Sequence, residues 1–146
     1  MRQGLHLEDI DVGMSATYAK TISDADIVLF AGISGDSNPV HVDDDYARET
    51  MFKGRIAHGM LTASFISAVL GTRLPGPGCI YLSQNLRFKA PVRIGDTVRA
   101  VVEVTEIDQD RARATVDTRC TGSDKTVNHA EAVLMVPRRV ERQAAE

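Results

Sequence analysis

A mostly apolar segment runs from His58 to Arg73, HGMLTASFISAVLGTR, and Pro75-Gly76-Pro77-Gly78 follows it almost at once. Apolar residues cover nearly every side of this stretch, which is typical of a helix buried in a protein core. The stretch is too short and too polar to span a bilayer comfortably. Because repeated proline and glycine cannot continue a helix, the sequence predicts one central buried helix with a sharp end.

The chain changes character after this helix, because alternating apolar and polar residues replace the continuous apolar pattern. Four segments show the alternation expected of strands: 80–90, 97–107, 112–120 and 127–136. Polar turn residues follow the first three of these segments, at Ile94–Asp96, Asp108–Asp110 and Thr121–Asp124. Closely spaced strands with such turns favour antiparallel pairing.

The N-terminal part adds one strand and two helices to this pattern. Residues 14–22 alternate loosely and predict a strand, and Ser23 begins a helix that ends near Gly35. Residues 43–50 predict a short helix with an acidic first turn. One strand before the central helix and four after it predict an α+β fold, in which a curved antiparallel sheet wraps around the helix.

Size and composition narrow the possible classes of protein. The 146 residues are most simply one domain (1–146), with a core over about 10–137 and a polar tail over 138–146. A formal charge of −3 and 5% aromatic residues argue against nucleic-acid binding. Cys79 and Cys120 form no Cys-x-x-Cys pair, so neither a zinc cluster nor a disulfide framework is indicated. The N-terminus has no apolar signal core, so we expect a cytoplasmic protein that is not bound to a membrane.

The segment Ser34-Gly35-Asp36-Ser37-Asn38-Pro39-Val40-His41 carries the strongest chemical signal. Pro39 lacks an N–H and disfavours a helical conformation at the residue before it, so we expect a stiff, non-helical loop here. Such a loop can aim Asp36 and His41 at one water molecule, which is a minimal acid/base device. Proton transfer of this kind requires neither a metal nor a redox cofactor. The same residues also occur in ordinary turns. From the loop alone, a catalytic role and a simple turn are therefore equally favoured.

Several separated motifs resemble one family in the same order along the chain. The run FAGISGDSNPVH (30–41) with Ala47 is similar to the hydratase-2 motif of the MaoC-like (R)-specific enoyl-CoA hydratases, which have the hot-dog fold. HGML (58–61), PGPG (75–78) and FKAPV (88–92) resemble the same family. The similarity extends over about 10–137 and is closest to the short bacterial enzymes that supply polyhydroxyalkanoate synthesis. Phe30 stands where the motif often has tyrosine, and this change removes no residue assigned to chemistry.

The resemblance implies roles for individual residues. Asp36 and His41 correspond to the catalytic pair, and the Gly59 N–H corresponds to the group that binds the thioester oxygen. Ser67 matches a serine near the active site, and a packing serine inside the core is an equally good interpretation. The substrate would be an acyl-CoA or acyl-carrier-protein (ACP) thioester, with no cofactor. The family's homodimers, whose sheets join side by side, imply a homodimer here.

Other residues on the motifs have plainer interpretations. Asn38 and Pro39 fix the shape of the loop. His58, at the start of the helix, is expected to bond locally. Arg87 and Lys89 could face phosphates of CoA, but an exposed strand face is usually just solvated.

Three rivals to a hydratase stay open at this stage. A 3-hydroxyacyl-ACP dehydratase would use the same residues in reverse on another carrier. A hot-dog thioesterase does not typically carry the Asp-x-Asn-Pro-x-His run. A non-catalytic acyl-CoA-binding subunit would have no need of both Asp36 and His41. The sequence does not determine the acyl chain length, the carrier, or which of the two groups protonates the α carbon.

Overall fold

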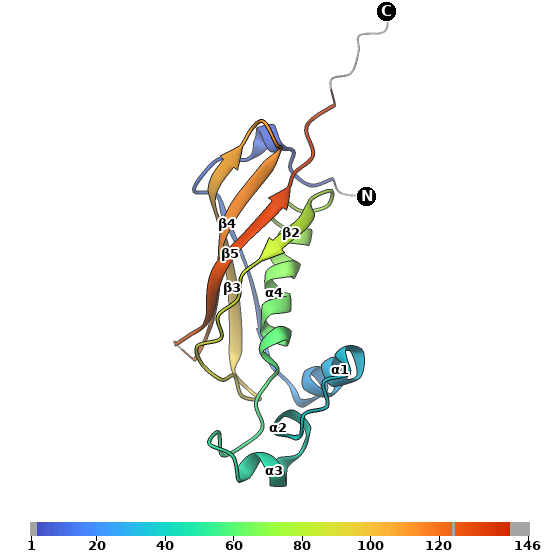
Figure 1. Ribbon diagram of the computed structural model, residues 1–146, viewed down its shortest axis with the longest axis vertical. Coiled ribbons are helices and arrows are strands. Elements are labelled where there is room, and N and C mark those ends of the chain that lie inside the picture. Colours follow the sequence, from blue (N-terminus) through green and yellow to red (C-terminus); the bar gives the residue numbers. More distant parts are fainter. Residues whose placement is uncertain (1–2, 124, 141–146) are drawn as a thin grey trace, which may run out of the picture.

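The helix α4, Gly59–Thr72, lies along one face of an antiparallel sheet in the computed structural model, which describes residues 3–123 and 125–140 (Figure 1). Its bounds confirm the helix predicted from the apolar stretch. The helix buries Leu61, Phe65, Ile66 and Val69 in the core. Because α4 and the inner face of the sheet cover each other, the predicted α+β layout is also confirmed.

The sheet has five strands in the order β1-β3-β4-β5-β2, and every neighbouring pair is antiparallel. The strands are β1 (Ser15–Thr21), β2 (Ile80–Gln84), β3 (Thr97–Asp108), β4 (Arg113–Gly122) and β5 (Lys125–Met135). Buried and exposed residues alternate along β3 and β4. One face of the sheet therefore packs on α4 and the other faces outward, with β1 and β2 at its two edges.

The segment predicted as a strand over 80–90 is only half a strand. Regular pairing ends at Gln84 after a bulge between Tyr81 and Ser83, and Phe88 forms an isolated bridge with Asn128. Asn85 and the nearby Pro91 are poor strand formers, which explains the early end.

Three short helices form a lobe beyond the end of the sheet, beside the N-terminus of α4 (Figure 1). They are α1 (Asp24–Ser34), α2 (Pro39–Val42) and α3 (Asp44–Arg48). Ser23 and Asp26 cap α1 reciprocally, and Gly35 ends it in the left-handed conformation (φ 79°). These contacts confirm the predicted start and end of this helix. A one-turn 3₁₀ helix, Leu7–Asp9, lies near the N-terminus.

The loop between Asp36 and His41 differs from its prediction. Instead of a wholly non-helical loop, the chain forms the single turn α2, with Asn38 as its N-cap and Pro39 as its first residue. Proline is tolerated at the first position of a helix, because the N–H it lacks would have no partner there. The prediction of a non-helical segment was therefore wrong from Pro39 onward.

Parts of two predictions lie outside the described residues. They are Asp124 in the predicted turn over 121–124 and residues 141–146 of the predicted tail. Within the described part of the chain, no helix has the length and apolar character needed to cross a membrane.

Candidate active site

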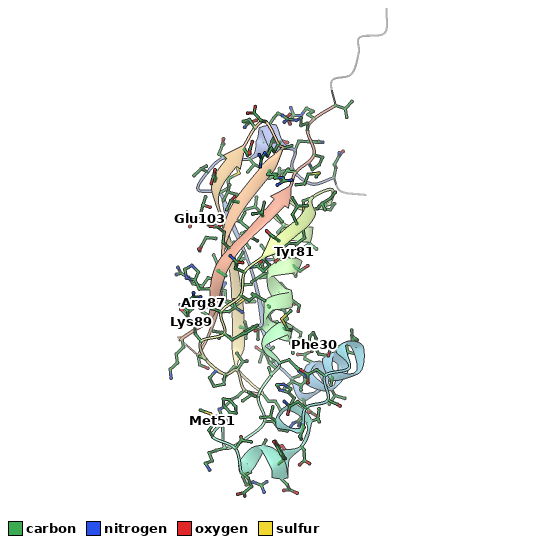
Figure 2. All side chains as sticks on the ribbon, in the orientation of Figure 1. Phe30, Met51, Tyr81, Arg87, Lys89 and Glu103 are labelled. Carbon is green, nitrogen blue, oxygen red and sulfur yellow. The ribbon has the colours of Figure 1, made fainter. Side chains whose placement is uncertain are left out.

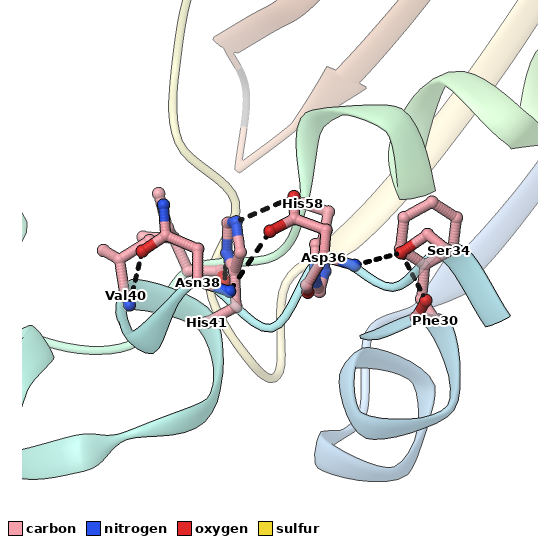
Figure 3. Close-up of polar contacts among 8 residues, drawn as sticks. Phe30, Ser34, Asp36, Asn38, Val40, His41 and His58 are labelled. Atoms are coloured by element: carbon pink, nitrogen blue, oxygen red, sulfur yellow. Dashed lines mark hydrogen bonds and ion pairs between the residues drawn. The ribbon is translucent and has the colours of Figure 1, made fainter. Parts of the chain in front are cut away.

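Asp36 and His41 face each other at the junction of the helical lobe and α4 (Figure 3). Asp36 Oδ2 lies 3.9 Å from His41 Nε2, while Asp36 Oδ1 accepts a hydrogen bond from the Asn38 N–H at 3.2 Å. The other ring nitrogen of His41, Nδ1, lies 2.8 Å from the carbonyl oxygen of Ile56. Since a carbonyl only accepts, Nδ1 carries a proton, and Nε2 is the ring nitrogen that faces the carboxylate.

Two local hydrogen bonds stabilise the segment that carries Asp36 and His41. Asp36 N–H donates to Ser34 Oγ at 3.1 Å, and Val40 N–H donates to Asn38 Oδ1 at 3.1 Å. The His41 ring is buried, whereas about half of the Asp36 side chain is exposed. A substrate can therefore approach the pair from the carboxylate side.

His58 is bound to this pair and not to its own helix. Its Nε2 lies 2.8 Å from the carbonyl oxygen of Asp36, 22 residues earlier in the chain. Its ring stacks on His41, with ring centroids 3.8 Å apart and an angle of 28° between the planes. The expectation of a locally bonded histidine was wrong, because the helical lobe folds back over the start of α4.

Arg55 is a second contributor that sequence reasoning missed. Its Nε donates to the carbonyl oxygen of His41 at 2.6 Å, and its Nη2 lies 2.6 Å from Asp24 Oδ1. Its Nη1 is 4.0 Å from Asp44 Oδ1. One largely buried guanidinium thus ties α1, α2 and α3 together. The sequence offers only a lone arginine in a connector as a signal.

A largely apolar cavity of about 350 Å³ opens beside Gly59, the first residue of α4. The first N–H groups of a helix have no partner inside it and lie at the positive end of its dipole. Phe88 covers Gly59 so closely that a Cβ added to Gly59 would lie 2.7 Å from two of its ring atoms. The lining residues are Met51, Phe52, Ile56, Ala57, Gly59, Thr62, Phe88, Lys89, Ala90, Pro91, Val92 and Val127.

Arg87 and Lys89 lie near each other on the segment after β2 (Figure 2). Lys89 lines the cavity beside Gly59 and so offers a cation to a bound ligand. Arg87 does not line this cavity and instead borders a second hollow with Asp117, His129 and Glu131. Both side chains are exposed, as expected for a solvated face, and Lys89 also lines the cavity.

Ser67 is not part of the cluster formed by Asp36, His41 and Gly59. It lies about 12 Å along α4 from Gly59 at a rise of 1.5 Å per residue. Its side chain is exposed, so the expectation of a packing serine inside the core was wrong. With Met60 and Ser64 it belongs to an exposed stripe of α4.

Ligand atoms of Asp36, His41 and His58 lie within 4.8 Å of one another, a spacing that a metal ion could bridge. The stacking of the two rings makes them a poor pair of ligands, because their in-plane lone pairs run side by side instead of converging. Carbonyl oxygens also occupy one nitrogen of each ring. This arrangement suits hydrogen bonding and proton transfer better than metal binding.

Thiol chemistry is poorly supported. Burial raises the pKa of the Cys120 thiol to about 11 and also raises the pKa of Cys79. Because the thiolate is the reactive form, neither cysteine is activated as a nucleophile at neutral pH. The groups of this site that are available for chemistry are the Asp36–His41 pair and the N–H groups at the start of α4.

Comparison with known proteins identifies the class. The family model described as "MaoC like domain" matches residues 8–126, so the chain belongs to the MaoC-like family. An (R)-specific enoyl-CoA hydratase of Rhodospirillum rubrum is 61% identical over 134 residues, covering 92% of this chain and 93% of the relative. The resemblance inferred from the motifs is thereby confirmed.

Solved structures confirm the hot-dog fold. An R-hydratase from Pseudomonas aeruginosa in its unliganded form has a TM-score of 0.88 at 43% identity, covering 98% of this chain and 94% of that one. The (R)-hydratase of Aeromonas caviae, described as involved in PHA biosynthesis, has a TM-score of 0.87 at 43% identity. This match covers 89% of this chain and 99% of the Aeromonas caviae chain.

Proposed function

We propose that this protein is an (R)-specific enoyl-CoA hydratase, which adds water to a trans-2-enoyl-CoA and gives the (R)-3-hydroxyacyl-CoA. The observation that carries the proposal is the distance of 3.9 Å between Asp36 Oδ2 and His41 Nε2. Two atoms at this separation can each lie about 2.8 Å from one water oxygen. The pair is too far apart for a direct hydrogen bond and well spaced to hold a water between them.

The reaction divides into balanced proton steps. His41 Nε2 and Asp36 orient the water, and the pair removes one proton as the water oxygen bonds to the β carbon. The π electrons move toward the thioester, and one proton returns to the α carbon. Because both groups contact one water, H and OH are added to the same face of the double bond. Positioned acid/base groups of this kind typically contribute about 10²–10⁴-fold.

The start of α4 is proposed to stabilise the negative charge that develops during the reaction. Negative charge develops on the thioester oxygen as water adds, and the Gly59 N–H is the donor proposed to receive it. A preorganised donor of this kind can be worth roughly 3–4 kcal/mol. An acyl thioester bound in the apolar cavity beside Gly59 would displace water from this interaction. Lys89, on the cavity wall, is placed to meet an anionic group of the CoA carrier.

The remaining assignments concern support and assembly. Asn38 and Pro39 are proposed to hold the loop, through the cap and first position of α2. Ser67 is proposed to contact the acyl chain on the exposed stripe of α4. The chain is proposed to be one domain, with a core over about 10–137, that works as a cytoplasmic homodimer. Its product is proposed to supply polyhydroxyalkanoate synthesis, because the Aeromonas caviae relative is described as involved in PHA biosynthesis.

The test is the loss of enoyl-thioester absorbance when purified protein meets crotonyl-CoA, with chiral analysis of the product. Formation of (R)-3-hydroxybutyryl-CoA is expected. Activity on crotonyl-ACP with none on the CoA ester of any chain length would indicate the dehydratase instead. Release of free thiol would indicate the thioesterase, and binding of acyl-CoA without turnover would indicate the binding subunit.

A further inference from the structure

His58 is an unusual residue at the start of α4. It occupies the N-cap, where Ser, Thr, Asp and Asn are preferred because their side chains accept a hydrogen bond from the first turn. The His58 side chain makes no such bond, although only 2% of the residue is exposed. Its burial therefore needs a reason other than capping of the helix.

The ring of His58 touches both members of the acid/base pair (Figure 3). Its Nε2–H donates to the main-chain carbonyl of Asp36 at 2.8 Å. Its face stacks on the His41 ring at 3.8 Å, and Phe30 packs against it with ring centroids 4.9 Å apart. A single buried ring thus contacts the backbone of the acid and the side chain of the base.

His58 also precedes Gly59 directly, so one peptide unit joins this ring to the proposed thioester-binding N–H. We propose that His58 is a positioning residue, which sets the spacing of Asp36 and His41 and fixes this pair relative to the Gly59 N–H. This inference rests on the proposed hydratase function. His58 does not touch the reacting atoms and acts through the three residues that it connects.

A packing role alone makes a different prediction. The Nδ1 atom of His58 is buried and has no hydrogen-bond partner among the described residues. An isolated buried nitrogen destabilises a fold, so an apolar ring of similar size would pack at least as well. If His58 only filled space, His58→Phe would be as stable and as active as the wild type. If it positions the pair through Nε2–H, His58→Phe loses kcat.

The kinetic experiment compares His58→Phe with His58→Gln on crotonyl-CoA. The first variant keeps a ring for stacking and loses the donor, and the second offers an amide N–H near the position of Nε2. We expect kcat to fall about 10²-fold in His58→Phe, as for a small misplacement of catalytic groups, with KM within about threefold. We expect His58→Gln to recover most of kcat. Wild-type kcat in folded His58→Phe overturns the proposal, as does an equal loss in both variants.

Ile66→Ala is the control for stability, because Ile66 is fully buried on α4 and has no part in the site. We expect this variant to lower the melting temperature and leave kcat in place. A fall in kcat equal to that of His58→Phe, at matched melting temperature, would reduce His58 to a structural residue and overturn the proposal.

Long-range ¹⁵N NMR of the four histidines separates this proposal from the proposed function, because it needs no turnover. We expect the Nδ1–H tautomer for His41 in the wild type and shifted or broadened His41 signals in His58→Phe. The signals of His6 and His129 serve as internal references and should not move. If the wild type hydrates no enoyl thioester, displaced His41 signals still support positioning. Unchanged His41 signals overturn it.

Discussion

The Asp36–His41 and Asp117–His129 pairs place the same two side chains in different surroundings. His129 Nε2 and Asp117 Oδ1 are 2.7 Å apart, so they bond directly to each other across neighbouring strands. Asp36 and His41 stand 3.9 Å apart with their other polar atoms bound to the backbone. The first pair satisfies itself, whereas the second leaves one oxygen and one nitrogen free for a third molecule.

We expect Asp36→Asn and His41→Asn each to lower kcat by about 10²–10⁴-fold. Asn at position 36 can still accept the bond from Asn38, and Asn at position 41 can still donate to the Ile56 carbonyl, so the fold should persist. Crotonyl-CoA kinetics and circular dichroism check the two expectations. Asp117→Asn and His129→Asn are matched controls, which should keep full kcat. A folded Asp36→Asn enzyme with full kcat would remove this carboxylate from the mechanism.

Asn128 is a buried polar residue whose hydrogen bonding affects the stability of the fold. It is 1% exposed on β5, and within residues 3–123 and 125–140 its amide has no partner other than a weak contact with the Cys120 thiol. The Cys120 thiol opposite it on β4 is only a weak hydrogen-bonding group. A buried group of this kind costs roughly 1–3 kcal/mol.

We therefore expect Asn128→Val to raise the melting temperature, by about 2–4 °C for each kcal/mol recovered in a chain of this size. Thr118→Val is the contrasting variant, because Thr118 Oγ1 accepts a hydrogen bond from Gln84 Nε2 at 2.9 Å. We expect Thr118→Val to lower the melting temperature. Calorimetry of both variants checks the pair, and a destabilised Asn128→Val protein would mean that the amide is satisfied, for example by a buried water.

At the scale of elements, the start of α4 and the segment after β2 act together. Gly59 begins the helix, and the Phe88 ring rests on it with no room for a side chain between them. The Phe88 side chain is about half exposed, so it can move away where a backbone could not. A side chain at position 59 would therefore push this ring into the cavity beside it.

We expect Gly59→Ala to lower kcat/KM strongly, and to do so far less when Phe88→Ala is also present. A double-mutant cycle of the four proteins on crotonyl-CoA measures this coupling. Equal losses in both backgrounds would locate the crowding on the substrate itself. No loss in either background would contradict the approach of the thioester to Gly59.

Helix and strand limits were predictable where local chemistry sets them. The Ser23 cap, the left-handed Gly35 and the apolar run of α4 gave α1 and α4 correctly, because each signal acts within a few residues. The strand predicted over 80–90 ends at Gln84, since pairing depends on β5 and not on local alternation alone. The contacts of Arg55 and His58 span 11 to 31 residues, and no local pattern records them.

At the scale of the whole molecule, the family motifs indicated the sheet wrapped around a helix, and the fold is confirmed by the strand order and the solved relatives. The exposure of Ser67 could not be predicted from the motifs. A motif gives a residue's position in the chain, but exposure of this side chain on α4 depends on what covers that stripe in an assembly. The free edge of β2 is the expected contact of the proposed homodimer.

The strand β2 is an edge of the sheet and carries apolar side chains that are unusually open to solvent: Ile80, Tyr81 and Leu82 are 53%, 38% and 40% exposed. An edge of this kind offers unpaired backbone groups to another strand. Pairing with β2 of a second copy would join two sheets side by side and cover these exposed side chains. The contact of the proposed homodimer is therefore expected to lie along β2.

We expect Leu82→Lys to convert the proposed homodimer to a monomer, because a lysine on each β2 would bring like charges together and leave two cations in an apolar contact. Sedimentation velocity measures the mass, and dilution should lower the melting temperature of the wild type but not of the variant. Ala19→Lys tests the other edge, β1, where the same charge should leave the dimer intact. If Leu82→Lys sediments as the wild type does, the contact lies elsewhere. Dissociation by both variants would instead indicate that either edge can pair. Only a monomeric Leu82→Lys protein together with a dimeric Ala19→Lys protein assigns the contact to β2.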